Sequence, residues 1–209
     1  MKFEDRQQAG VRLAQALTGW RGRPDLIVLA LPRGGVPVAA EVAKALGAPL
    51  DVLVVRKLGY PGQEEFAMGA IASGGVRVMS DIDGAWPVSD RAVEAAVQRE
   101  QAELARREKA YRGARPPPLI KDQVVILVDD GLATGATMRA AVQSVRAGQP
   151  ARILVAVPVA SRDAAASLSA LADEVVCLQT PEPFHAVGLW YLDFDQTSDE
   201  EVMRLLART

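Results

Sequence analysis

The chain has one cysteine and one histidine among its 209 residues. A lone cysteine cannot close an internal disulfide, and the two residues fall short of the four ligands of a structural zinc site. Cys177 stands in the apolar segment Val175 to Leu178, which is typical of a small buried hydrophobic residue rather than of a nucleophile. The sequence therefore argues against a disulfide-stabilised fold, a zinc centre and cysteine catalysis.

Long apolar runs and an excess of one charge are also missing. No segment approaches the roughly 18 apolar residues that a membrane-spanning helix needs, and residues 1–10 carry acids where a secretory signal needs basic residues. The 24 basic and 26 acidic residues give a formal net charge of -2, which is too small to attract nucleic acid or an anionic membrane non-specifically. We therefore expect a cytoplasmic protein with small-molecule ligands and no nucleic acid or membrane partner.

What the chain does have is an alternation of apolar strands and helices. Continuous β-prone apolar segments predict strands at residues 26–31, 49–55, 123–128, 153–157 and 175–178. Helical periodicity around them predicts helices at residues 4–18, 36–46, 138–147 and 161–172. Because strands that alternate with helices form α/β folds, we expect a doubly wound, mostly parallel sheet with helices on both faces.

The middle of the chain breaks this alternation. Residues 58–86 are rich in glycine and contain two short candidate strands at residues 66–71 and 76–79. A long charged helix is expected to begin after Ser89, which can cap it, and to end near residue 111.

These features fit one domain. A chain of 209 residues with 49% hydrophobic content can bury one sizeable core but hardly two. We expect residues 1–209 to form a single domain, with a small irregular lobe at residues 58–115 and a C-terminal hood or tail at residues 180–209.

The most distinctive segment follows the predicted strand 123–128. Two adjacent acids, Asp129 and Asp130, lead into small residues and threonines at the start of a helix. Backbone N–H groups at a helix start can bind a phosphate, and carboxylates suit sugar hydroxyls or a divalent cation. The segment therefore predicts a site for a ribose that carries a phosphate. The candidate phosphate-binding residues are Ala133, Thr134, Gly135, Ala136 and Thr137.

Basic residues follow the first two predicted strands. Ligands of a doubly wound sheet bind outside the carboxyl ends of its strands, so these residues should meet the same site. Arg33 offers bidentate phosphate contact, and Gly34 and Gly35 allow close backbone approach. Arg56 and Lys57 end the second predicted strand. We expect these residues to bind a more highly charged group, for which pyrophosphate is the candidate.

The segment Val124 to Thr137, V-V-I-L-V-D-D-G-L-A-T-G-A-T, resembles the signature of type I phosphoribosyltransferases. The signature consists of apolar residues, two acids, and a loop of small residues and threonines. The resemblance extends from about Leu26 to Asp195, because the two basic segments stand where that family has its pyrophosphate-contacting loops. The resemblance also implies that Thr134 to Thr137 bind the 5-phosphate of phosphoribosyl pyrophosphate.

The family resemblance further implies a transferase of nucleotide and nucleoside metabolism that uses Mg²⁺. Pyrophosphate would be displaced at C1 through an oxocarbenium-like state, and an acceptor, expected to be a nitrogenous base, would take the phosphoribosyl group. The implied catalytic residues are Asp129, Asp130 and Arg33, and the two aspartates would contact the metal indirectly, through ribose hydroxyls or water. The chain departs from the family at Ala136, where many members have glycine. Ala133 stands where the 6-oxopurine branch has its basic aspartate, which argues against hypoxanthine or guanine as acceptor.

The acceptor site is the part on which the sequence leaves most open. Trp190 and Phe194 are the candidate acceptor-binding residues because their rings can stack on a planar base, but they can equally anchor the C-terminal stretch on the core. His185 is either a proton-transfer group or a residue with a solvent-facing or structural role. Since members of the family are frequently dimers, a homodimer is expected.

Rival interpretations differ in strength. A phosphorelay receiver domain begins with the strand before its acids and needs about 110 further residues, more than this chain has after Asp129. A P-loop nucleotidase needs a lysine where this loop has Ala136. The strongest alternative keeps the fold and denies the catalysis, as a regulatory protein that binds phosphoribosyl pyrophosphate.

Overall fold

A five-stranded sheet forms the centre of the computed structural model, which describes residues 2–60, 63–79 and 89–208. Its strands lie in the order β2-β1-β6-β7-β8, and every neighbouring pair is parallel. The strands are β1 (Leu26–Ala30), β2 (Leu50–Val52), β6 (Val124–Val128), β7 (Arg152–Val159) and β8 (Glu174–Gln179). The predicted α/β sheet is confirmed.

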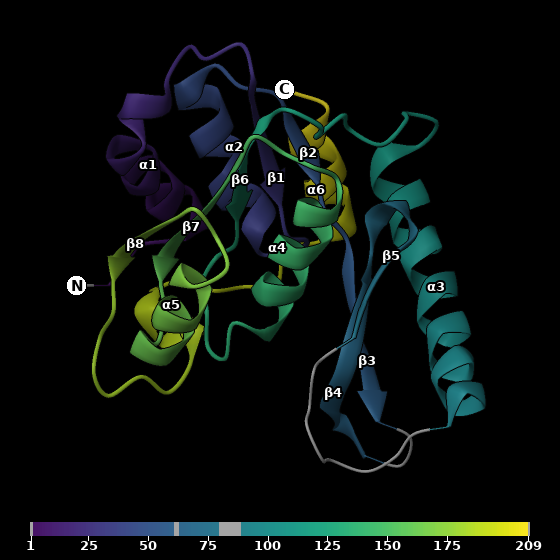
Figure 1. Cartoon of the computed structure of the whole chain (residues 1–209). Helices are drawn as coiled ribbons and strands as arrows, with labels where there is room; N and C mark the ends of the chain where they lie inside the picture. Colours follow the sequence, from purple (N-terminus) through teal and green to yellow (C-terminus); the bar gives the residue numbers. More distant parts are fainter. Residues whose placement is uncertain (1, 61–62, 80–88, 209) are drawn as a thin grey trace.

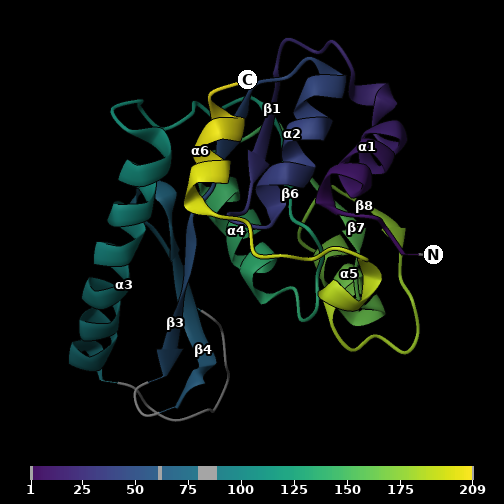
Figure 2. The same cartoon turned by 180° about the vertical axis from the view of Figure 1, so that it is seen from behind.

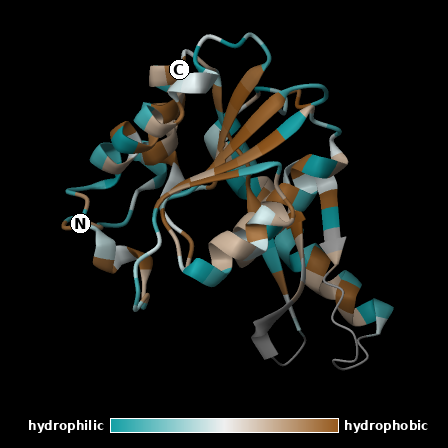
Figure 3. Cartoon of the chain, turned by 60° about the vertical axis from the view of Figure 1, so that its left-hand side comes forward, coloured by the Kyte–Doolittle hydropathy of each residue, from teal (hydrophilic) through white to brown (hydrophobic). Residues whose placement is uncertain are grey.

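Helices cover both faces of this sheet (Figures 1 and 2). Side chains alternate between the two faces of a strand, so Val28 and Ile126 pack into one apolar cluster while Leu29 and Leu127 pack into another. Figure 3 shows the resulting continuous apolar colouring along the central strands. The first cluster is covered by α1 (Arg6–Ala16) and α2 (Gly35–Leu46), and the second by α4 (Ala136–Ala147) and α5 (Arg162–Ser169).

A second, antiparallel sheet leaves from the carboxyl edge of the first. It consists of β3 (Val55–Tyr60), β4 (Gln63–Ala72) and β5 (Val76–Met79), in that order. Together with α3 (Asp90–Arg112), this three-stranded sheet projects from the body of the molecule (Figure 1). Residues 61–62 and 80–88 of the lobe expected from the sequence lie outside the described residues.

The single strand expected at residues 49–55 is wrong, because the chain changes its pairing partner there. The N–H of Leu53 still donates to Ala30 of β1, whereas the N–H and carbonyl of Val54 both bond to Ser73, next to β4. Arg56 and Lys57 therefore lie inside β3 and not at the end of a core strand.

The last helix, α6 (Asp199–Leu206), is absent from the sequence expectations, which treat residues 180–209 as a hood or tail. Short 3-10 helices lie at Thr18–Trp20, Ser73–Gly75 and Val187–Trp190. The C-terminal stretch pairs with the N-terminus: the N–H of Phe3 donates to Trp190, and the N–H of Leu192 donates back to Phe3, both at 2.8 Å. Among the helices of the described residues, none has the length and apolar character to cross a membrane.

Helix α3 is fastened to β2 by the buried side chain of Arg112. Its Nε lies 3.1 Å from a carboxylate oxygen of Asp51, its Nη1 lies 3.2 Å from Glu108, and its Nη2 donates to the Val52 carbonyl. The Arg112 side chain is 4% exposed, so these contacts are made largely out of water.

We expect Arg112→Leu to lower the free energy of unfolding by about 3 kcal/mol, because it leaves the partly buried Asp51 carboxylate without its cation. Urea denaturation followed by circular dichroism measures the change. Arg106→Leu, on the same helix, is the matched control, since Arg106 is 58% exposed and its pair with Glu103 is a surface pair. Equal stability of the two variants would contradict the anchoring role of Arg112.

Candidate active site

The loops after β1 and β6 touch at the carboxyl edge of the sheet. A Cβ atom added to Gly34 would overlap the Asp130 carboxylate, and one added to Gly35 would lie 2.7 Å from the Val128 carbonyl oxygen and 2.9 Å from the Cα of Asp129. Backbone and acids approach this closely only because both positions lack a side chain. The structure therefore brings Arg33 to Gly35 and the two acids into one place.

The segment between the acids and α4 is held in place from β7. The N–H of Leu132 donates to Val159, the N–H of Ser161 donates to Leu132, and the Ser161 hydroxyl donates to the Ala133 carbonyl at 2.6 Å. These bonds leave Ala133, Thr134 and Thr137 exposed at the sheet edge, at the start of α4.

In the described part of the chain, two α-helices lack a side-chain hydrogen bond at their N-terminus, α4 and α2. Their N-cap residues are Gly135 and Gly34. The other four α-helices are each capped by a side-chain oxygen, from Asp5, Ser89, Ser161 or Ser198. First-turn N–H groups without an intrahelical partner, together with the helix dipole, favour an anion. At α2 the N–H groups of Gly35 and Val36 already donate to the Leu31 and Arg33 carbonyls, and Pro37 has no N–H. Of the two uncapped helix ends at the candidate site, the start of α4 is therefore the one that suits a phosphate.

Arg139 belongs to this site, and the sequence analysis missed it. Its Nη1 donates to the Thr134 carbonyl at 2.9 Å, which places the guanidinium beside the loop. A cation near a helix N-terminus is unfavourable for the helix dipole. The signal that could have identified Arg139 in the sequence is its position in the first turn after the predicted phosphate loop. A bound anion at the loop would offset the unfavourable interaction of the arginine with the helix dipole.

The two aspartates have unlike surroundings. Burial raises the pKa of Asp129 well above its ordinary value, and the neighbouring Asp130 charge raises it further. Burial also raises the pKa of Asp130, but the guanidinium of Arg6 opposes that shift, with its Nε 2.8 Å from Oδ2. Asp129 Oδ1 accepts a 2.8 Å hydrogen bond from the Asp130 N–H. The pair is therefore a half-buried acidic centre in which Asp130 has a cationic partner.

Arg33 lies at the edge with a loose counter-ion. Its Nη1 is 3.7 Å from Oδ1 of Asp199, beyond hydrogen-bond distance, and its side chain is 32% exposed. The same Asp199 oxygen accepts a 2.7 Å hydrogen bond from Tyr111 of α3. Burial, with this bond, raises the pKa of Tyr111 to about 12. The guanidinium of Arg33 can thus turn toward a ligand without breaking a hydrogen bond to Asp199.

Arg56 and Lys57 have different placements, because neighbouring residues of a strand face opposite sides. Arg56 pairs with Glu100 of α3, with its Nε and Nη2 at 2.8 and 2.7 Å from the same oxygen. Lys57 is exposed and shares the opposite face with Val55, which packs on the cluster that includes Met138 of α4. Of the two, Lys57 lies on the face of β3 that is turned toward α4.

The C-terminal aromatic residues lie beside the acids and pack with Val159 of β7. Tyr191 is buried and its hydroxyl donates to the Asp130 carbonyl at 2.5 Å, while Phe194 has the Arg6 guanidinium 3.9 Å above its ring. Trp190 packs against the cluster of Phe3 and Tyr191. Stacking of Trp190 and Phe194 on an acceptor stays a prediction.

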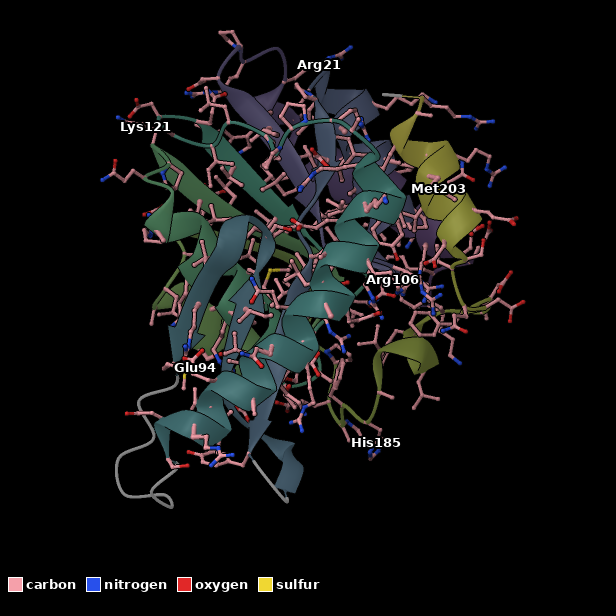
Figure 4. All side chains as sticks on the ribbon, turned by 90° about the vertical axis from the view of Figure 1, so that its right-hand side faces the viewer. Arg21, Glu94, Arg106, Lys121, His185 and Met203 are labelled. Carbon is pink, nitrogen blue, oxygen red and sulfur yellow. The ribbon has the colours of Figure 1, made fainter. Side chains whose placement is uncertain are left out.

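His185 is exposed, and Figure 4 shows it at the periphery of the ribbon. Glu94 and Arg106, which Figure 4 also labels, lie on the exposed surface of α3. His185 is therefore solvent-facing, and a role in proton transfer stays a prediction.

The donor set fits a magnesium ion held chiefly by its ligand. Carboxylate oxygens suit Mg²⁺, but Oδ2 of Asp130 is taken by Arg6 and a Gly34 backbone atom lies beside that carboxylate. In the described ranges no three His, Cys, Asp or Glu side chains lie together as a metal-binding group. The aspartates could therefore hold a hydrated ion through its water ligands, but they do not enclose a bare ion.

Comparison with known proteins agrees with this geometry. Residues 5–194 match the model of the phosphoribosyl transferase domain family. A provisionally named phosphoribosyl transferase of Mycobacterium tuberculosis H37Rv is 50% identical over 207 residues, a match that covers 99% of this chain and 46% of that protein. The chain thus spans less than half the length of this curated relative.

Solved structures show the same fold. The protein TT1426 from Thermus thermophilus is 46% identical and superposes with a TM-score of 0.89, over 100% of this chain and 99% of that one. The AQ2163 protein from Aquifex aeolicus shares the fold at 11% identity, with a TM-score of 0.54 over 88% of this chain and 78% of its own. With a family model matched over most of its length and a relative at 50% identity, this chain belongs to the phosphoribosyl transferase family.

Proposed function

We propose that this protein binds 5-phosphoribosyl 1-pyrophosphate with Mg²⁺ and transfers the phosphoribosyl group to a nitrogenous base, releasing pyrophosphate. The observation that carries the proposal is the contact of Gly34 and Gly35 with Asp130 and Asp129 beside the uncapped start of α4. A diol-binding centre with an anion-binding helix end on one side and the Arg33 guanidinium on the other suits a sugar with phosphate groups at both ends.

Each part of the ligand has a matching group. The 5-phosphate is bound by backbone N–H groups and hydroxyls between Thr134 and Thr137, with Arg139 as an added cation. The ribose hydroxyls donate to Asp129 and Asp130. The pyrophosphate lies against Arg33 to Gly35, where the Arg33 guanidinium binds it, and Lys57 approaches from β3.

The reaction needs little covalent chemistry from the protein. The bond between C1 and a pyrophosphate oxygen breaks, a bond from C1 to a base nitrogen forms, and the proton of that nitrogen is released. Bound Mg²⁺ neutralises charge on the leaving pyrophosphate. The residues of this chain position the sugar and stabilise the departing charge, Arg33 through its guanidinium and the aspartates by countering the positive charge that develops on the ribose.

Calorimetric titration with phosphoribosyl pyrophosphate and Mg²⁺ tests the proposal. We expect the wild-type protein to bind, and the double variant Asp129→Asn, Asp130→Asn to bind at least 100-fold more weakly, as an order-of-magnitude estimate from two lost charge-assisted hydrogen bonds. Asp122→Asn, which changes an exposed acid before β6, is the control and should bind like the wild type.

Absence of binding by the wild-type protein would refute the proposal. Where binding is found, bases are screened for release of pyrophosphate, beginning with planar bases other than hypoxanthine and guanine. Binding without turnover of any base would favour the regulatory alternative over the transferase.

A further inference from the structure

Arg6, in the first turn of α1, contacts both the acidic centre and the C-terminal segment. Its Nε donates to Asp130 Oδ2 at 2.8 Å, its Nη1 donates to the Asp195 carbonyl at 2.7 Å, and its guanidinium lies 3.9 Å from the centre of the Phe194 ring. The side chains of Arg6 and Asp130 are 12% and 14% exposed. One arginine thus joins the N-terminal helix, the acidic centre and the C-terminal segment.

We infer that Arg6 is a positioning residue for ribose recognition, which holds Asp130 by one carboxylate oxygen so that the other faces a ribose hydroxyl. The inference rests on the proposed function, since it assigns a ribose to the Asp129 and Asp130 centre. It adds a role for α1 and for residues 194–195, which act on Asp130 through Arg6.

The geometry of Asp130 supports this role. Its Oδ2 accepts the Arg6 bond, whereas its Oδ1 accepts no hydrogen bond from the described residues. Its backbone is held separately, because the Tyr191 hydroxyl donates to its carbonyl. Gly34 packs against the same carboxylate, so the side chain has little room to turn. A carboxylate fixed at three points presents its remaining oxygen in one direction, which a freely rotating aspartate would not do.

Arginine suits this task better than lysine. Its planar guanidinium can donate to two acceptors in its plane while an aromatic ring covers its face, which is the arrangement of Asp130, Asp195 and Phe194 around Arg6. A lysine can keep the ion pair with Asp130, but a compact ammonium cannot reproduce the planar contact to all three groups.

Sugars that lack single hydroxyls test the inference directly. Ribose 5-phosphate, 2-deoxyribose 5-phosphate and 3-deoxyribose 5-phosphate are titrated into the protein, and binding is followed by phosphorus NMR. We expect the wild-type protein to prefer ribose 5-phosphate about tenfold over the analogue that lacks the hydroxyl facing Asp130. In Arg6→Gln this preference should fall toward one, while affinity for the deoxy analogue changes little. Arg12→Gln removes the same charge from the same helix and should keep the wild-type preference.

A second variant covers the case in which Arg6→Gln does not fold. Arg6→Lys keeps the charge and should reduce the preference by about threefold, because the Asp195 and Phe194 contacts are lost. If either folded Arg6 variant keeps the full preference for ribose, the positioning role is overturned and Arg6 only joins the two ends of the chain. If the wild-type protein binds phosphoribosyl pyrophosphate but shows no preference among the three sugars, the positioning role falls alone. Absence of phosphoribosyl pyrophosphate binding removes the proposed function, so the two failures are distinguishable.

Discussion

The Gly35→Ala variant is expected to lose about 2–3 kcal/mol of unfolding free energy and to bind no phosphoribosyl pyrophosphate. The added Cβ would lie 2.7 Å from the Val128 carbonyl oxygen and 2.9 Å from the Cα of Asp129. Both atoms belong to the backbone at the end of β6, in the middle of the sheet, so neither can move aside as a flexible side chain would. The loop after β1 must therefore separate from Asp129, and the two halves of the site move apart.

Thermal unfolding and calorimetry measure the two effects separately. A loss of this size corresponds to a melting temperature about 5–10 °C lower for a chain of this length. Gly19→Ala is the matched control, because a Cβ at that exposed glycine meets no atom within 4 Å. Normal ligand binding by Gly35→Ala would show that the contact between the two loops is not needed for the site.

The sheet and the phosphate loop could be predicted from sequence because both depend on local patterns. A strand buried on both faces reads as a continuous apolar run, as Val124 to Val128 does, and all five of its residues are buried. The acids and the small residues that follow are consecutive, so their place at a strand end and a helix start follows from the strand alone.

Features that depend on contacts between residues far apart in the sequence could not be predicted from local patterns. Nothing in residues 50–60 marks the change from β1 to β4 as pairing partner, because the hydrogen bonds to Ser73 that fix it come from a residue 19 positions after Val54. Arg6 was missed for the same reason, since it lies 124 positions from Asp130 in the chain. The sequence around one residue of such a pair does not indicate which distant residue it contacts.

The helix α6 was missed although a local signal was present. Ser198 and Glu201 have the spacing of a capping box, Ser-x-x-Glu, and the Ser198 hydroxyl does accept from the Glu201 N–H at 3.1 Å. Helix α6 matters for the site because Asp199, the residue after its N-cap, lies beside Arg33.

The single variant Asp129→Asn is expected to be more stable than the wild-type protein at neutral pH, by on the order of 1 kcal/mol, and to bind phosphoribosyl pyrophosphate far more weakly. Burial and the Asp130 charge raise the pKa of Asp129, so its ionised form costs folding free energy. An asparagine removes that charge, and its amide oxygen can still accept the hydrogen bond from the Asp130 N–H. It cannot accept hydroxyl donors with two anionic oxygens, so the ligand loses a strong contact.

The sign of the pH dependence follows from the raised pKa. Because the folded state holds the Asp129 proton more tightly than the unfolded state does, wild-type stability falls as pH rises from the ordinary carboxyl value of 3.8 through the raised folded pKa. The variant lacks this titration. Its advantage should therefore be full above the folded pKa of Asp129 and should disappear as the pH falls toward 3.8, where the wild-type residue is protonated and resembles an asparagine. Urea denaturation at a series of pH values measures this difference. A constant difference across the series, or a less stable variant at neutral pH, would mean that the Asp129 carboxylate is not a destabilising group held in the fold for its ligand.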